Sequence, residues 1–177
     1  AVMQMEGKNW LEAVNFLKDF SNTTISQSAQ TVRDRRPAPT QHSNTPHSVI
    51  TNIVVPNNDK LLEYFAQRGI SKEILQQYTQ QVHYRNIKEN KDYFGIGIPN
   101  QSGGYDIRNP YIKAKVGASD MTVIPGTRNE AVVFEGMTDM LSYLQMAKDN
   151  GKPNDRTLVV LNSVTNTGTF IERFKNY

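Results

Sequence analysis

The chain has 177 residues, a formal net charge of +3, 37% hydrophobic residues and no cysteine. Disulfides and thiolate metal sites are therefore excluded, and no apolar run approaches the roughly 18 residues that a membrane-spanning helix needs. No basic segment followed by an apolar one marks a secretory leader, so we expect a cytoplasmic protein. The length suits one medium domain or two small ones, and the slight positive charge permits a nucleic-acid partner without requiring one.

The first part of the chain predicts one helix and a linker. Residues 6–20 carry an apolar face at helical spacing, made by Trp10, Leu11, Val14, Leu17 and Phe20. Residues 21–55 are rich in Ser, Thr, Asn, Gln and Pro and lack periodicity, which indicates a flexible linker. Its small arginine cluster could contact phosphates, but the pattern favours ordinary solvated charge; it comprises Arg33, Arg35 and Arg36.

A helical hairpin and an antiparallel meander are expected next. Residues 57–80 predict two short helices, with a capping signal around Asn58 and a stop at Gly69. Residues 81–123 predict an antiparallel meander whose strands lie around residues 82–87, 93–98 and 105–108. The glycine-rich turn before residue 105 separates the last two of these strands.

From residue 131 the pattern changes to strand, helix, strand, helix. Residues 131–134 and 157–161 are continuous apolar runs, typical of parallel strands that are buried on both faces. The helix between them has one apolar face, formed by Met137, Met140, Leu141 and Leu144. A short final helix is marked by Phe170, Ile171 and Phe174. We therefore expect an α/β unit with a right-handed crossover, within a chain that is α+β overall.

Two carboxylates lie where the first apolar run ends. Glu135 follows the run directly, Gly136 permits a tight turn, and Asp139 falls in the first turn of the next helix. Open α/β sheets place their sites at the carboxyl ends of parallel strands, so the pair could hold a divalent metal ion. An acid in a first helical turn can also simply complement the helix dipole, and this second interpretation has about equal weight.

The segment Glu135-Gly136 with Asp139 resembles the first motif of the toprim fold. Other segments, in the same order, resemble the toprim-domain DNA primases of bacterial mobile and conjugative elements. Residues 8–14 are similar to the last helix of their zinc-binding domain, and residues 64–71 to the opening of their polymerase core. Residues 94–109 resemble the β-rich subdomain of that core, and residues 162–169 the stretch between the first two toprim strands.

The resemblance implies a division of the chain into four parts. Residues 1–20 would end a zinc-binding domain whose ligands lie upstream, and residues 21–55 would be the linker. Residues 56–124 would hold the hairpin and the β-rich subdomain, and residues 125–177 the first part of a toprim domain. The second toprim motif, Asp-x-Asp, does not occur in the chain, so we expect a fragment that stops before it.

The same resemblance implies a function and its residues. The intact protein would synthesise RNA primers on single-stranded DNA by nucleotidyl transfer that depends on Mg²⁺ or Mn²⁺, with zinc only in the upstream domain. Glu135 would act as acid, base or ligand, and Asp139 would help to hold a metal ion. Arg108, Lys113 and Lys115 would lie near a groove for template and nucleotide, although ordinary surface charge explains them equally well.

The expected partners are single-stranded DNA, ribonucleotides and a replicative helicase, with no membrane. Because two carboxylates make a weak magnesium site, we expect this chain alone to be inactive and to bind metal weakly. A toprim nuclease and a non-catalytic DNA-binding module of a mobile element remain alternatives. The hairpin and the glycine-turn meander favour the primase, because a toprim nuclease would not need them.

Overall fold

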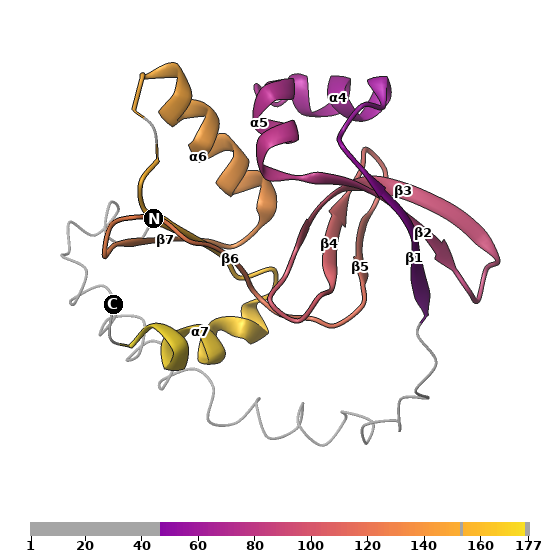
Figure 1. The fold of residues 1–177 in the computed structure, drawn as a ribbon. Helices are drawn as coiled ribbons and strands as arrows, with labels where there is room; N and C mark the ends of the chain where they lie inside the picture. The colour runs from indigo at the N-terminus through magenta and orange to yellow at the C-terminus, as the bar shows by residue number, and fades with distance from the viewer. Residues whose placement is uncertain (1–46, 153, 176–177) are drawn as a thin grey trace, which may run out of the picture. The chain divides into compact units, whose positions relative to one another are not determined.

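The computed structural model describes residues 47–152 and 154–175, which form two sheets and four α-helices (Figure 1). The predicted helix at residues 6–20, the arginine cluster and most of the predicted linker lie outside the described residues. The strand orders are β1-β2-β3-β4-β5 in one sheet and β6-β8-β7 in the other. The mixed architecture confirms the α+β prediction. Within the described ranges, no helix combines the length and apolar character needed to cross a membrane.

The five-stranded sheet is antiparallel throughout, as predicted for the meander. Its strands are β1 (Ser48–Val54), β2 (Gln80–Asn86), β3 (Lys91–Pro99), β4 (Tyr105–Arg108) and β5 (Lys113–Val116). The linker prediction is wrong for β1, which pairs with β2 on both sides of an irregularity between Ile50 and Asn52. The β-branched residues of this segment favour a strand. Because β1 lies at the edge of the sheet and is partly polar, however, it has no continuous apolar pattern that would reveal the strand in the sequence.

The hairpin consists of α4 (Asp59–Ala66) and α5 (Lys72–Tyr78), as predicted. The side chain of Asn58 accepts a hydrogen bond from the Leu61 amide at 3.2 Å and thereby caps α4. Gly69 has a φ of +73°, the left-handed conformation that commonly ends a helix. These two signals set the bounds of the first helix and so the position of the loop that follows it.

The second sheet contains the predicted parallel pair. β7 (Ala131–Phe134) and β8 (Thr157–Val160) are parallel, and α6 (Met137–Asp149) connects them. β6 (Thr122–Ile124) pairs antiparallel with β8, so assigning residues 122–124 to the meander subdomain was wrong. β8 is buried throughout, whereas β7 is only half-buried, because β8 takes the centre of the sheet. The 3₁₀ turn η1 (Val164–Asn166) and the predicted helix α7 (Thr167–Phe174) follow.

One hydrophobic core joins the hairpin, α6 and both sheets. The predicted apolar face of α6 is confirmed, since all four of its residues are buried. These side chains share a cluster with Leu61, Phe65, Ile74 and Leu75 of the hairpin, Ile96 and Ile98 of β3, and Leu158 and Val160 of β8. The beginning of α6 is thus held beside the same face of the five-stranded sheet that Ile96 and Ile98 present.

Close approach of β3 and β4 requires a residue without a side chain at position 95. A Cβ on Gly95 would lie 2.7 Å from Ile107 Cγ2 and 2.8 Å from the Arg108 carbonyl oxygen. We predict that Gly95→Ala displaces β4 and lowers the free energy of unfolding by about 2 kcal/mol, measured by urea denaturation. Gly168→Ala in α7, where nothing lies within 4 Å, should leave stability unchanged or raise it. Equal stability of both variants would contradict the prediction.

Candidate functional site

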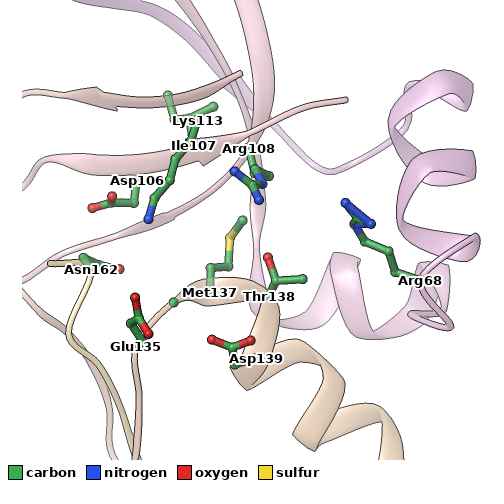
Figure 2. A pocket seen from close by; sticks show the side chains of 11 residues that line it. Arg68, Asp106, Ile107, Arg108, Lys113, Glu135, Met137, Thr138, Asp139 and Asn162 are labelled. Carbon is green, nitrogen blue, oxygen red and sulfur yellow. The ribbon is translucent and has the colours of Figure 1, made fainter. Parts of the chain in front are cut away.

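A pocket of about 350 Å³ lies where β7 gives way to α6, opposite β4 and β5 (Figure 2). Four of the five residues singled out in the sequence line it: Glu135, Asp139, Arg108 and Lys113. The fifth, Lys115, is not among the lining residues and forms an ion pair with Asp106 instead. The fold therefore brings together carboxylates and cations that lie more than twenty positions apart in the sequence.

The acidic side of the pocket is the junction between β7 and α6. Glu135 and Asp139 are both exposed, and Gly136 between them is the N-cap residue of α6. No side chain caps this helix, and the Asp139 carboxylate folds back, with one oxygen 3.7 Å from where a Cβ on Gly136 would lie. Asp139 thus occupies the first turn, where the helix dipole stabilises a negative charge. The predicted placement of both carboxylates is confirmed.

The basic side of the pocket follows from the way side chains alternate between the two faces of β4. Asp106 and Arg108 are two positions apart and so share a face of the strand. Their partners on β5 are Lys115 and Lys113, respectively. Arg108 therefore lies directly opposite Lys113, and like charges in this arrangement repel each other. Neither belongs to an ion pair within the described part of the chain. An anion between these two side chains would relieve their repulsion.

Arg68 adds a third cation, which the sequence analysis missed. It lies in the loop after α4, and its side chain reaches toward the pocket from the hairpin (Figure 2). Its guanidinium carbon lies 4.4 Å from the centre of the Tyr64 ring, a cation–π contact that restrains its orientation. Its one sequence signal is its position just before the helix-ending Gly69, which does not distinguish it from an ordinary surface arginine.

Asp106 is a buried carboxylate that the sequence analysis also missed. It is 5% exposed, and both of its oxygens lack a hydrogen-bond partner among the described residues. Lys115 Nζ lies 3.7 Å from Oδ1, an ion pair that is longer than a hydrogen bond. Burial raises the pKa of Asp106, and the charges of Lys115 and Lys113 oppose that rise only in part. The sequence signal for this buried carboxylate was its position between two apolar strand residues, Tyr105 and Ile107.

Asn162 completes the lining near Asp106. It is 3% exposed and has a φ of +60°, a left-handed conformation that asparagine tolerates better than most residues. Its Nδ2 donates to the Asp120 carbonyl oxygen at 3.0 Å and to Thr122 Oγ1 at 3.1 Å. Its Oδ1 has no partner among the described residues. The amide is therefore fixed through its nitrogen, while its oxygen is left unused.

The carboxylates at the pocket do not by themselves complete a magnesium site. Mg²⁺ requires near-octahedral oxygen coordination, and a protein site usually supplies carboxylates together with substrate phosphates. Within residues 47–152 and 154–175, no group of three or more His, Asp or Glu side chains is placed to hold a metal ion. Glu135 and Asp139 could contribute two ligands, and weak binding of metal by this chain stays a prediction.

The buried charge of Asp106 should make stability depend on pH. Because its folded-state pKa is raised, the folded state holds this proton more tightly, and stability falls as the pH rises through that pKa. We predict that Asp106→Asn raises the free energy of unfolding at pH 7 by about 1 kcal/mol. The gain should vanish below the unfolded-state pKa of about 4, measured by urea denaturation across pH. A gain that is the same at every pH would contradict this assignment.

Comparison with protein-family models gives a match to part of the chain. The model of a domain of unknown function, DUF8464, matches residues 50–117, less than half of the chain. The matched stretch includes the hairpin, β2 to β5 and most of β1, and so contributes Arg68, Asp106, Arg108 and Lys113 to the pocket. Glu135, Asp139 and Asn162 lie outside it. No curated protein and no solved structure matches the chain.

Proposed function

We propose that the pocket binds nucleotide phosphates in a nucleotidyl-transfer site, and that the chain is part of a toprim-type DNA primase. Such a protein would synthesise RNA primers on single-stranded DNA. The observation that carries the proposal is the convergence of Glu135 and Asp139 with Arg108 and Lys113, which come from the other sheet. Phosphoryl and nucleotidyl transfer need this combination, because catalysis there depends on positioning and on neutralising phosphate charge.

Each group has a distinct role in the proposed site. Arg68, Arg108 and Lys113 would neutralise phosphate oxygens, and the guanidinium groups can bind them with two parallel hydrogen bonds. Glu135, exposed at the strand end, could accept the proton of an attacking hydroxyl. Mg²⁺ or Mn²⁺ is the expected cofactor of the complete enzyme, where it would supply further charge neutralisation.

Two alternatives remain. A toprim nuclease would use the same carboxylates and could use the same cations, but it would not need the hairpin and the five-stranded sheet that supply those cations. A non-catalytic DNA-binding module is favoured by one observation, the lack of a third metal-binding side chain beside Glu135 and Asp139 in the described part of the chain. In such a module the three cations would contact the DNA backbone and the carboxylates would have no catalytic role.

The cationic side can be tested on the chain itself. We predict that Arg108→Ala combined with Lys113→Ala weakens binding of single-stranded DNA about tenfold or more, measured by fluorescence anisotropy. The slope of log affinity against log salt should fall by about 2, since each phosphate contact contributes about 1. Lys88→Ala with Arg128→Ala removes two exposed cations outside the pocket and serves as the matched control. Equal losses in both double variants would remove the groove assignment.

The reaction requires the complete protein to which these residues belong. We predict template-dependent incorporation of ribonucleotides into primers, lost in the Glu135→Gln variant, because the amide cannot accept the hydroxyl proton. Denaturing gels of labelled products provide the measurement, and DNA binding by the variant should be unchanged. Cleavage of DNA that Glu135→Gln abolishes would identify the nuclease instead. DNA binding with neither reaction would identify the non-catalytic module.

A further inference from the structure

One end of the pocket carries hydrogen-bond acceptors without donors. Both carboxylate oxygens of Asp106 and the Oδ1 of Asn162 are buried without a partner within the described residues. Both residues line the pocket, and Figure 2 shows them on the same side of it as Glu135, with Arg68 at the opposite side. Buried polar groups in folded proteins are nearly always hydrogen-bonded, so unused acceptors at a pocket need an explanation.

The local structure keeps these acceptors in place. Asp106 lies on β4 between two paired strands, and the nearby Lys115 is too distant for a hydrogen bond, at 3.7 Å. Asn162 is held by two hydrogen bonds from its nitrogen and by a left-handed backbone that few residues adopt. The acceptors are therefore fixed before any ligand arrives, and because they are closed to solvent, a ligand reaches them only when a neighbouring side chain moves aside. Hydrogen bonds to the ligand would then recover the stability that the unpaired oxygens cost.

The chemistry of the two ends indicates what kind of molecule fits. The end near Asp106 and Asn162 needs a group rich in hydrogen-bond donors, such as vicinal hydroxyls. The end near Arg68 and Arg108 suits phosphate oxygens. A ribonucleotide carries both groups a few bonds apart, and a pocket of about 350 Å³ is within the usual size of a small-ligand site.

We propose that Asp106 and Asn162 form a ribose subsite, which accepts hydrogen bonds from the sugar hydroxyls of a nucleotide whose phosphates lie against Arg68 and Arg108. This inference rests on the proposed function, because it takes a nucleotide as the ligand. A 2′-deoxynucleotide leaves acceptors unpaired, so the subsite selects ribose over deoxyribose.

Calorimetry on the 177-residue chain with ATP and 2′-deoxy-ATP tests the subsite. ATP should bind about tenfold more tightly, the effect of one hydrogen bond to a charged acceptor. Asp106→Ala should reduce ATP affinity to that of 2′-deoxy-ATP and leave the latter unchanged or slightly tighter. Asn162→Gly should also reduce the ratio of the affinities for ATP and 2′-deoxy-ATP, and glycine is compatible with the φ of +60° at this position. Asp92 is an exposed carboxylate of β3 that pairs with Arg85, so Asp92→Ala should leave the preference for ATP over 2′-deoxy-ATP unchanged.

The outcomes separate this inference from the proposed function. Equal affinities of the wild-type chain for both nucleotides, with both weakened by Arg108→Ala, would overturn the ribose subsite and leave the phosphate site standing. An equal loss for both nucleotides in Asp106→Ala would assign that residue a structural role, which circular dichroism and thermal melting would document. If GTP, titrated in parallel, binds more tightly than ATP while the 2′-hydroxyl has no effect, the acceptors contact the base and the ribose subsite is overturned. Binding of neither nucleotide would overturn both proposals.

Discussion

The packing of α6 against both sheets is the constraint on which the rest of the structure depends. Met140, Leu141 and Leu144 share one buried cluster with Ile96 and Ile98 of the five-stranded sheet and with Leu158 and Val160 of the smaller sheet. This burial orients the beginning of the helix toward β4, and therefore Glu135 and Asp139 toward Arg108. The site is thus assembled by apolar contacts, since no ion pair within the described residues links the acidic junction to the cationic strands.

The pocket concentrates interactions that oppose folding. Arg108 and Lys113 repel each other across neighbouring strands, and Asp106 is a buried charge without a hydrogen bond. Such local conflicts occur in proteins where function requires them, and the surrounding core offsets their cost. The same groups would gain most from a ligand, because an anion between the cations and a donor at Asp106 would each remove an unfavourable term.

The sequence allowed prediction of the parts whose signals are local. Helical periodicity located α6 and its buried face, and glycine and asparagine signals located the hairpin, while an acid at a strand end indicated Glu135. β1 and β6 were missed because a polar edge strand and a three-residue strand carry little pattern. Arg68, Asp106 and Asn162 were missed because only tertiary packing brings a loop arginine, a strand acid and a post-strand asparagine together.

The shared core has a consequence for proteins that contain only the stretch matched by the family model. That stretch ends at residue 117, before α6 and β8, which cover the apolar face of β3. A chain that stopped there would expose Ile96, Ile98 and the inner side of the hairpin to water. A protein that contained only this stretch would therefore need another cover for that surface. The segment that covered this surface would decide which groups face β4 and β5. The same stretch could therefore take part in different chemistry in different proteins.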